Sequence, residues 1–404
     1  MTAPPSRAGL ALAAVCAAGL FAISWGLLHL HAEAHGQIRD TPEYQAYGEG
    51  VVHSEVPYRD FHVEYPPGAL PAFVLPAIGS PSEHGYRSRF DLLMLMCGIG
   101  GIGAMAAALG ALGADPIRLL WALPFAGVTP LLLGPVVLTR YDFWPAALAT
   151  AALAALCAGR DRLSFALLGV AASAKVYPVV LVPLFVAHVW RRRGAREAGV
   201  ALGIGLLVTA AIFVPFVGLA PGGVWDSVRR QVTRPLQIES LGSAALIALH
   251  HLFGLGLRVE TSHGSQNLAG SLPSAVGAAG SAVVLAGLAA LWLWFARRPR
   301  SQETLVRVSA AAVCVFVAFG KVLSPQYMIW LIPLVPLVRG RRGLAAGGLL
   351  ATALLLTQLW FPKQYWNLVF GFGGYESALV LARDVVLLGL VGVLVWPQTA
   401  TRTG

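Results

Sequence analysis

The sequence predicts an all-α protein that crosses a membrane about 12 times, or up to about 14 times if half-helices are counted. Three observations carry this prediction. The 404 residues are 57% hydrophobic and only 12% charged, whereas a soluble domain has about 25% charged residues. Apolar runs of about 20 residues, the length that spans a hydrocarbon core, recur along the whole chain. The arginines gather in the short loops between these runs, as in other polytopic membrane proteins.

The charge and the cysteines exclude several partners and cofactors. The net charge of +10 comes from the loop arginines that orient the helices, so we expect the lipid bilayer and no nucleic acid as a partner. Neither an HExxH nor a GxxxxGK[ST] motif is present, so we expect no metal site, no nucleotide-binding loop and no cofactor. The cysteines lie inside apolar runs without CxxC spacing, which indicates no disulfide: Cys16, Cys97, Cys157 and Cys314.

We interpret residues 1–404 as a single integral membrane domain that begins with a span over residues 8–30. The Ala-Glu-Ala at 32–34 resembles a signal-peptidase site, but the run is long for a signal peptide, so we expect an uncleaved helix. A first large outer loop follows at 31–65, with a short helix starting at Thr41 as N-cap. This loop holds seven of the nineteen acidic residues: Glu33, Asp40, Glu43, Glu49, Glu55, Asp60 and Glu64.

Residues 66–219 form the expected N-terminal helical module. We expect residues 66–78 to run back inward as a short helix, to a cytoplasmic turn marked by Arg87 and Arg89. The run at 118–139 contains three prolines, which favours two half-helices over one span.

A similar short pattern, a lysine followed by an arginine cluster, occurs in each half of the chain. Lys175 precedes the arginine cluster at 191–193, and Lys321 precedes the arginines at 339, 341 and 342. Each separation of about 16–18 residues corresponds to about 25 Å of helix, close to the thickness of a hydrocarbon core. The pattern predicts both lysines near the outer face and both arginine clusters in the cytoplasm.

The second large outer loop, at 220–271, breaks the positive-inside rule. Its Arg229, Arg230 and Arg234 lie outside in this topology, which suggests an anionic ligand at the outer face; contact with lipid headgroups is the alternative. The piece at 241–257 is apolar enough to lie on the membrane. The C-terminal helices at 272–396 then end in the cytoplasm.

The stretch at 54–70 is where we expect the chemistry. Asp60 lies among aromatic residues just before Pro66 and Pro67, and a carboxylate there is suited to remove a proton from an attacking hydroxyl group. The alternative is that Asp60 only pairs with Arg59 or caps a turn. Glu64 has two equal interpretations, binding of sugar hydroxyls or capping of the next helix.

Cationic side chains between apolar runs suggest a bound anion. Ionisable residues at membrane depth are costly and often functional, so matched contexts for Lys175 and Lys321 suggest one shared anion, with snorkelling to the headgroups as the alternative. Arg140 and Asp142 form a second polar cluster. With Asp60 as the catalytic residue, the substrate-binding candidates are Arg59, Glu64, Tyr65, Arg140, Asp142, Lys175, Arg234, Glu239, Lys321 and Gln326.

Five pieces of sequence resemble one family of enzymes. VPYRDFHVEYPPGAL at 56–70, AKVYPVVLVP at 174–183, RPLQIES at 234–240, GKVLSPQYMIWLIP at 320–333 and ARDVVLL in the last span are similar to the GT-C membrane glycosyltransferases. Within that superfamily they resemble glycosyltransferase family 87, the polyprenol-phosphate-mannose-dependent α-mannosyltransferases of actinobacterial envelopes.

The resemblance implies a complete reaction. A catalytic aspartate of the first outer loop falls on Asp60. A polyprenyl-phosphate sugar, with mannose as the sugar, is the donor at the outer face of the plasma membrane, and transfer to a glycolipid or polysaccharide hydroxyl inverts the anomeric centre. Two other functions stay open: a lipid or sugar transporter or flippase, which predicts two similar halves, and an envelope polysaccharide polymerase or ligase.

Overall fold

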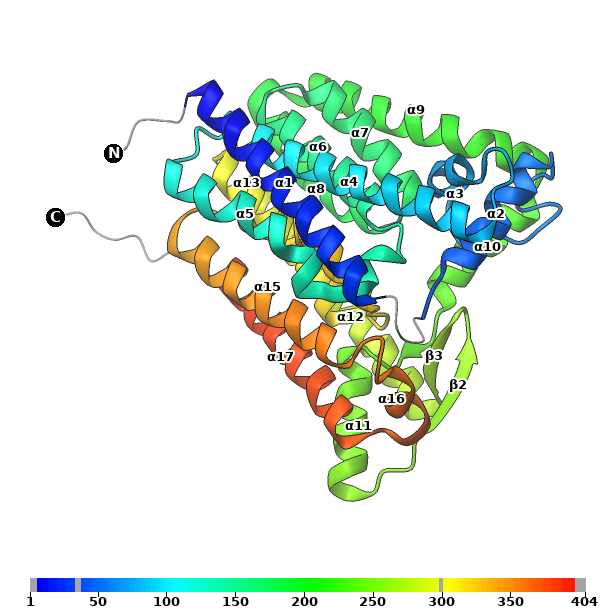
Figure 1. Cartoon of the computed structure of the whole chain (residues 1–404). Helices are drawn as coiled ribbons and strands as arrows, with labels where there is room; N and C mark the ends of the chain where they lie inside the picture. Colours follow the sequence, from blue (N-terminus) through cyan, green and yellow to red (C-terminus); the bar gives the residue numbers. More distant parts are fainter. Residues whose placement is uncertain (1–5, 33–37, 298–300, 397–404) are drawn as a thin grey trace.

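The computed structural model describes residues 6–32, 38–297 and 301–396, and the chain is built mainly from helices (Figure 1). Glu33 and Ala34 of the peptidase-like segment lie outside these residues. Eight helical segments of the described chain are long and apolar enough to cross a membrane. They are α1 (Arg7–Ala32), α4 (Glu83–Ala111), α5 (Pro116–Leu133) with η2 (Gly134–Leu138), α9 (Ala195–Leu219), α12 (Ser271–Ala296), α13 (Gln302–Phe319), α15 (Gly340–Trp360) and α17 (Gly374–Val395).

Four shorter legs run between the same two ends of the bundle. Prolines divide two of them into 3₁₀ and α segments, because proline removes a backbone donor and disrupts the regular helix. With the eight long segments they agree with the predicted number of about 12 crossings. The short legs are α6 (Phe143–Cys157), α7 (Asp161–Ala174), η3 (Tyr177–Leu181) with α8 (Val182–Arg193), and η4 (Pro325–Tyr327) with α14 (Met328–Leu331) and η5 (Val335–Leu337).

The two ends of the bundle differ in character. We call the end at which α1 begins and α17 ends the terminal end, and the opposite end the site end (Figure 1). At the terminal end, Arg118 pairs with Glu303 at 2.7 Å, and Asp161 pairs with Arg192 and with Arg193. These contacts join the start of α5 to the start of α13, and the start of α7 to the end of α8. Arg118 also donates to the Leu337 carbonyl, just before the arginines at 339, 341 and 342, so both arginine clusters lie at the terminal end.

The helix α3 (Leu70–Ala77), which follows the first large loop, does not cross the bundle. The evidence is the position of the next helix, α4. Asp91, near the start of α4, accepts a hydrogen bond from Trp25 at 3.0 Å and contacts His29 at 2.9 Å, and both partners lie near the end of α1. The helix α4 therefore starts at the site end, so the predicted inward run at 66–78 is wrong. Its helix α3 (Leu70–Ala77) has 8 residues, about 12 Å, far less than the roughly 30 Å of a hydrocarbon core.

The same geometry corrects three local predictions. Arg87 and Arg89 precede Asp91 on α4 and lie at the site end, not at the end of the arginine cluster at 191–193, whose side they were predicted to share. The expected half-helices at 118–139 are one span, because α5 continues through Pro124 and Pro130 into η2. The N-cap of the first loop helix is Asp40 and not Thr41.

The site end carries a layer built from the two large loops. It contains α2 (Thr41–Val52), η1 (Pro67–Ala69) and α3 from the first loop, and α16 (Tyr365–Gly371) between the last two spans. The second loop supplies α10 (Pro221–Thr233), α11 (Leu241–Phe253) and a three-stranded antiparallel sheet in the order β1–β3–β2 (Figure 1). The strands are β1 (Leu236–Gln237), β2 (Arg258–Ser262) and β3 (Ser265–Ala269).

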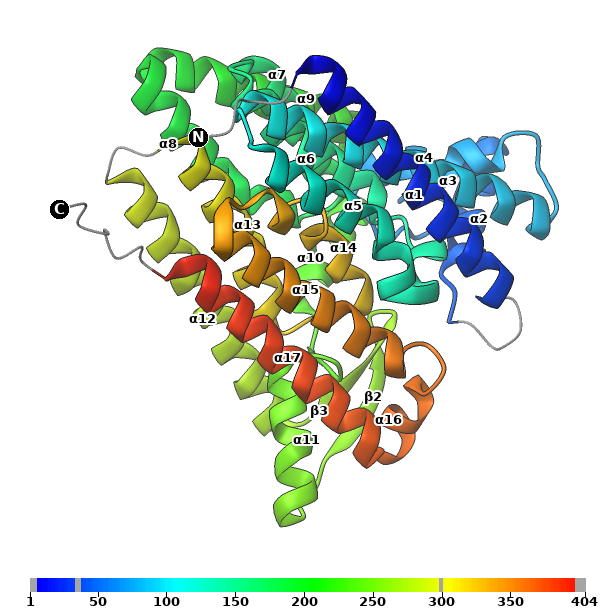
Figure 2. The same cartoon turned by 60° about the vertical axis from the view of Figure 1, so that its left-hand side comes forward.

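The small sheet was not predicted, although its hairpin has a recognisable turn. His263 and Gly264 connect β2 to β3, and both have positive φ, 53° and 64°. Two central residues with positive φ define the tight turn whose twist matches that of a β-hairpin. From this layer, α11 packs against the spans α12 and α17, and α17 packs in turn against the spans α13 and α15 (Figure 2).

Aromatic packing fixes the first loop on the bundle. Tyr44 of α2 stacks on Phe73 of α3 with ring centroids 4.5 Å apart, and Tyr65 meets Tyr141 edge to face at 5.0 Å. Such pairs stabilise beyond the burial of their area by about 0.5–1.5 kcal/mol each. Because Tyr141 stands between Arg140 and Asp142, this packing places the loop over those two charges.

Candidate active site

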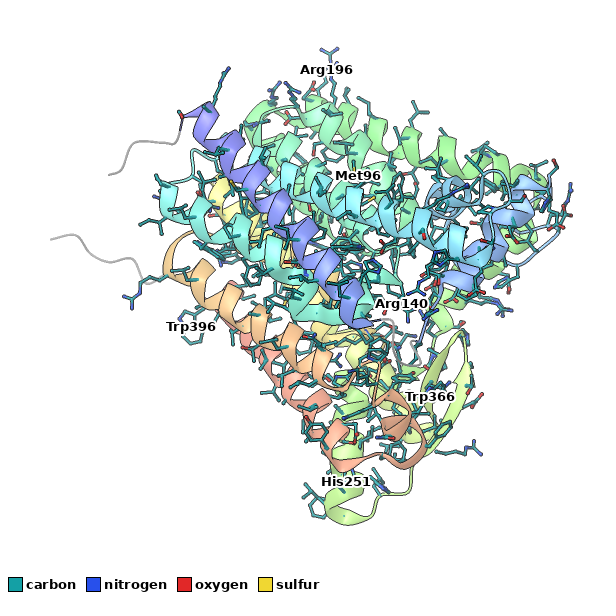
Figure 3. All side chains as sticks on the ribbon, in the orientation of Figure 1. Met96, Arg140, Arg196, His251, Trp366 and Trp396 are labelled. Carbon is teal, nitrogen blue, oxygen red and sulfur yellow. The ribbon has the colours of Figure 1, made fainter. Side chains whose placement is uncertain are left out.

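Charged side chains from distant parts of the chain meet where the site end of the bundle faces the sheet. Arg140, at the start of the loop between η2 and α6, is buried at this boundary (Figure 3). Its guanidinium forms an ion pair with Oδ2 of Asp40, and the same oxygen accepts a hydrogen bond from the Tyr44 hydroxyl at 3.2 Å. Asp40 stands at the N-cap of α2 but its side chain makes no capping hydrogen bond. Its carboxylate is therefore directed into the site.

Lys175 is fixed inside the site by an ion pair and a box of aromatic rings. Its ammonium lies 2.7 Å from Oδ1 of Asp142 and 4.5 Å from the ring centre of Tyr141. The indole N–H of Trp330 donates to the same Asp142 oxygen at 2.6 Å, and the Trp330 ring stacks on Tyr177 and on Tyr327. With only 14% of its side chain exposed, Lys175 does not snorkel.

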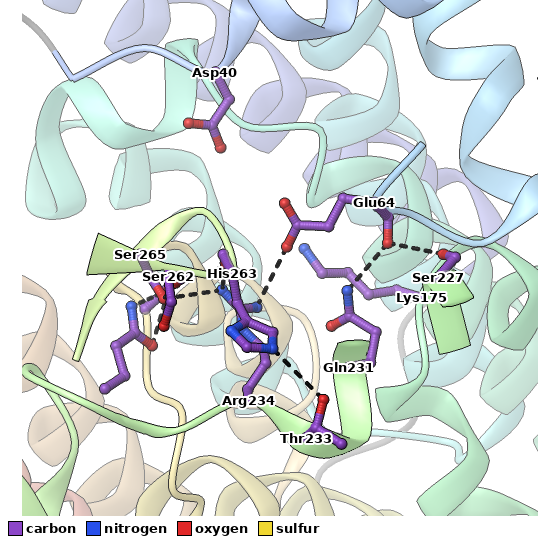
Figure 4. Close-up of polar contacts among 12 residues, drawn as sticks. Asp40, Glu64, Lys175, Ser227, Gln231, Thr233, Arg234, Ser262, His263 and Ser265 are labelled. Carbon is purple, nitrogen blue, oxygen red and sulfur yellow. Dashed lines mark hydrogen bonds and ion pairs between the residues drawn. The ribbon is translucent and has the colours of Figure 1, made fainter. Parts of the chain in front are cut away.

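Glu64 and Arg234 form a looser pair across the site. Oε1 of Glu64 lies 3.8 Å from Nη1 of Arg234, and Arg234 also donates to the carbonyl of His263 at 3.1 Å. The Glu64 carbonyl accepts hydrogen bonds from Ser227 and Gln231 of α10, both at 3.1 Å. Figure 4 shows that Asp40 and Glu64 point into the same space, with Lys175 and Arg234 beside it.

Burial raises the pKa of the Glu64 carboxyl, because desolvation disfavours the charged form; the positive charges of Arg234 and Lys175 oppose this rise. Burial has a larger effect on Glu239, at the end of the segment that carries β1, and raises its pKa to about 7 against the opposing charges of Arg383, Arg140 and Arg234. Glu239 is 2% exposed. Arg383 of α17 donates to the Glu239 carbonyl and pairs with Asp384 at 2.8 Å.

Asp60 and Arg59 stand apart from this cluster. Arg59 donates two hydrogen bonds to Asp60, at 2.8 and 2.9 Å, and the backbone N–H of Val56 donates a third at 2.7 Å. Both side chains lie on an exposed turn, and the hydrogen bonds from Arg59 and Val56 lower the pKa of Asp60 to about 2. This is the local pairing that the sequence left open, so the role of Asp60 as the base stays a prediction that the geometry does not support.

The other predicted residues lie around or at the edge of the cluster. Tyr65 packs beside Lys175, with its ring centre 5.9 Å from the ammonium. Gln326 is partly buried in η4, next to Tyr327, whose ring centre is 5.8 Å from the same ammonium. Lys321 lies at the edge of the cluster. Its ammonium donates to the Val232 carbonyl at 2.8 Å, at the end of α10.

Sequence reasoning missed Asp40, Trp330 and the link from Arg383 to Glu239. A signal for Asp40 was present, because it is an acidic residue directly before the Thr-Pro that starts a helix. The other two depend on contacts between residues more than 140 positions apart, which no local pattern reveals.

The assembled cluster is suited to bind an anion. Arg140, Lys175 and Arg234 bring three cations together, and Nε of Arg140 and Nε of Arg234 are buried with no hydrogen-bond partner in the described part of the chain. A buried donor without a partner is costly, so a phosphate oxygen supplied by a ligand would satisfy it. Within residues 6–32, 38–297 and 301–396, no three His, Cys, Asp or Glu side chains gather as metal ligands would.

Comparison with known proteins identifies the class. The model of glycosyltransferase family 87 matches residues 61–325, more than half of the chain, and the model of mannosyltransferase (PIG-M) matches residues 271–396. The protein is a polytopic membrane glycosyltransferase of the GT-C type. Within that class it belongs to glycosyltransferase family 87, and the transporter interpretation is set aside. No curated protein matches the chain.

Among solved structures, the fold is similar to ArnT from Cupriavidus metallidurans bound to undecaprenyl phosphate. The TM-score is 0.50 at 16% identity, and the match covers 96% of this chain and 77% of ArnT. ArnT in the apo state gives a TM-score of 0.47 at 15% identity, covering 94% and 77%. At these identities the first match shows a shared fold, which agrees with the predicted all-α polytopic architecture.

Proposed function

We propose that this protein transfers mannose from a polyprenyl-phosphate donor to a hydroxyl group of a glycolipid or polysaccharide acceptor. The observation that carries the proposal is the meeting of Arg140, Lys175 and Arg234 with the carboxylates of Asp40 and Glu64. Family membership supports sugar transfer, and the PIG-M match supports mannose. The undecaprenyl phosphate of the ArnT structure supports a polyprenyl-phosphate donor.

The three cations are proposed to hold the donor phosphate. Arginine guanidinium groups present planar, fork-shaped donors that match phosphate oxygens, and the lysine adds a point charge. As the bond between the anomeric carbon and the phosphate oxygen breaks, the leaving polyprenyl phosphate takes the electron pair. Fixed cations in a site of low dielectric constant stabilise that developing charge more strongly than water would. Such a leaving group needs little protonation.

Asp40 is the base that the geometry favours. Arg140 and Tyr44 both hold its Oδ2, and its carboxylate points into the space that Glu64 also faces (Figure 4). The acceptor hydroxyl is proposed to bind at Oδ1. It loses its proton to Asp40 as its oxygen attacks the anomeric carbon from the side opposite the phosphate, which inverts the centre. Glu64, across the same space, is proposed to bind sugar hydroxyls, one of the two roles that the sequence left open.

The site end is proposed to face the outside of the plasma membrane. The arginines at 191–193 and at 339, 341 and 342 lie at the terminal end, which the positive-inside rule assigns to the cytoplasm. Two arginines at the site end, Arg229 and Arg230, are neutralised in part by ion pairs to Asp226 at 2.8 and 2.9 Å.

The test is product analysis with the whole protein in membranes. We expect incubation with polyprenyl-phosphate mannose and a lipid extract to yield a mannosylated product and free polyprenyl phosphate, detected by mass spectrometry. The Asp40→Asn protein, inserted at the same level, should give neither above background. If the wild-type protein consumes no polyprenyl-phosphate sugar of any kind, the proposal is overturned.

A further inference from the structure

An apolar groove runs along one side of the bundle, and none of the charged-cluster residues lines it. It lies between α12, α13 and α17 (labelled in Figure 2) and has a volume of about 690 Å³. Its lining is almost wholly hydrocarbon, including Val283, Leu291, Val315, Phe319 and Val391. Small residues of α12 at positions 286, 287 and 290 make the hollow, because an alanine or glycine leaves room that a larger side chain would fill.

The two ends of the groove differ. At the terminal end stand Trp294 and Arg307, and the Arg307 guanidinium lies 5.5 Å from the Trp294 ring centre and donates to the Leu394 carbonyl at 2.5 Å. This cation is thus engaged with the protein. At the other end the groove reaches Phe319, the last residue of α13. From Arg307 to Phe319 the helix rises about 18 Å.

The Phe319 end adjoins the segment that carries Arg234. Lys321 follows two residues after Phe319, and Gly277 of α12 faces it. A Cβ atom placed on Gly277 would lie 3.7 Å from Cβ of Lys321 and 3.6 Å from Cβ of Leu236 in β1. Leu236 comes two residues after Arg234. The groove therefore runs from the terminal end of the bundle to Phe319, next to the segment that leads to Arg234.

We propose that this groove holds the polyprenyl chain of the donor, which leaves at the Lys321 end so that its phosphate reaches the charged cluster. This inference rests on the proposed function. A branched hydrocarbon fits the apolar lining, and a chain bound by its head needs a cation at one end only. Both end cations donate to a backbone carbonyl, Arg307 to that of Leu394 and Lys321 to that of Val232. The Lys321 end also adjoins the segment of Arg234, whose Nε is buried with no hydrogen-bond partner in the described part of the chain. The assignment gives Lys321, which lies outside the inner cluster, a place at the point where the phosphate enters the site.

A bulky residue in the groove tests the proposal against a matched control. Ala290→Trp fills the lining, whereas Leu285→Trp places the same ring on a lipid-facing position of α12, where Leu285 is 67% exposed and does not line the groove. We expect Ala290→Trp to raise the KM for decaprenyl-phosphate mannose about tenfold, since a few buried methylene groups account for that factor. For Ala290→Trp, the KM for geranyl-phosphate mannose and the kcat with either donor should equal the values for Leu285→Trp.

A photoreactive decaprenyl phosphate without a sugar separates this inference from the proposed function. In the wild-type protein it should label peptides of α12 and α13, and Ala290→Trp should remove the label. If the groove is labelled in a protein that transfers no sugar, the proposed function is wrong, but the assignment of the groove to a polyprenyl chain stands.

The groove assignment is wrong if transfer proceeds and Ala290→Trp shows the KM of Leu285→Trp for both donors. It is also wrong if the label lies elsewhere while a photoreactive phospholipid labels α12 and α13. Gly287→Leu is the second blocking variant if Ala290→Trp does not reach the membrane.

Discussion

Two aspartates of the first large loop, Asp60 and Asp40, form ion pairs with arginines in opposite surroundings. Asp60 pairs with its neighbour Arg59 on a turn where the side chains remain 35% and 52% exposed. Asp40 pairs with Arg140, one hundred positions away, and the Arg140 side chain is 7% exposed. The first pair depends only on adjacent residues, whereas the second exists only once α2 has packed onto the bundle.

The difference shows why the local pair was the easier one to find and the weaker candidate for catalysis. Charges in water interact weakly, and the same charges in a medium of low dielectric constant interact several times more strongly. Stabilisation of a developing phosphate charge needs cations that are already fixed and shielded from water. Arg140 meets both conditions, and Arg59 meets neither.

The largest effect in this comparison is expected for Asp40→Asn. The change keeps the size of the side chain and removes its basicity, so we expect turnover to fall by about 10²–10⁴-fold. Donor binding, measured with the photoreactive decaprenyl phosphate, should persist because Arg140, Lys175 and Arg234 are unchanged. Turnover of Asp40→Asn near the wild-type rate would instead reopen Glu64 and Asp60 as the base, with Glu64→Gln and Asp60→Asn as the deciding variants.

The next effect concerns Lys175, whose charge is balanced inside the protein by Asp142. Lys175→Met removes a fixed cation and should lower turnover by about 10²-fold. It also leaves the buried Asp142 without its partner, which costs about 3–5 kcal/mol of unfolding free energy. The double variant Lys175→Met with Asp142→Asn removes that penalty. Thermal unfolding should therefore recover in the double variant while turnover does not, and recovery of both would mean that Lys175 only supports the fold.

Most of the fold could be predicted from the sequence, because span length and arginine position are local properties. The predicted helix class and the number of crossings follow from runs such as those that form α9 and α12. The prediction of an inward run at 66–78 was wrong. An apolar segment of this length can either cross the membrane or pack against α2, and only tertiary contacts decide between the two.

The candidate site divides in the same way. Lys175, Arg140, Asp142, Arg234 and Glu64 were recognisable because charge is rare in this chain, and the structure brings them together. Their partners were not recognisable. The sequence shows Lys175 and Lys321 in matching contexts, yet one is enclosed by aromatic rings and the other ends at a backbone carbonyl. The difference comes from what packs above each lysine, which the local pattern does not encode.

Glu239 should make donor binding depend on pH in the neutral range. Its pKa of about 7 means that the carboxyl is neutral below pH 7 and anionic above it. An anion beside Arg140 and Arg234 repels the donor phosphate, so the donor KM should rise between pH 6 and pH 8 by about threefold to tenfold. Glu239→Gln should give the low KM at both values. An unchanged slope in that variant would place the titrating group elsewhere.

The smallest effect is expected for Asp60→Asn, the counterpart of the first prediction. Its carboxylate is bound by Arg59 and by the Val56 N–H on an exposed turn, and an exposed ion pair contributes little because water and salt screen it. Asparagine keeps an oxygen that accepts the Val56 hydrogen bond, so the turn should hold its shape. We expect turnover within about twofold of wild type, with the kcat of Asp40→Asn and Asp60→Asn measured side by side at equal expression. A dead Asp60→Asn enzyme with normal donor binding would mean that the exposed turn closes onto the site during the reaction, and the base would return to the residue that the sequence first indicated.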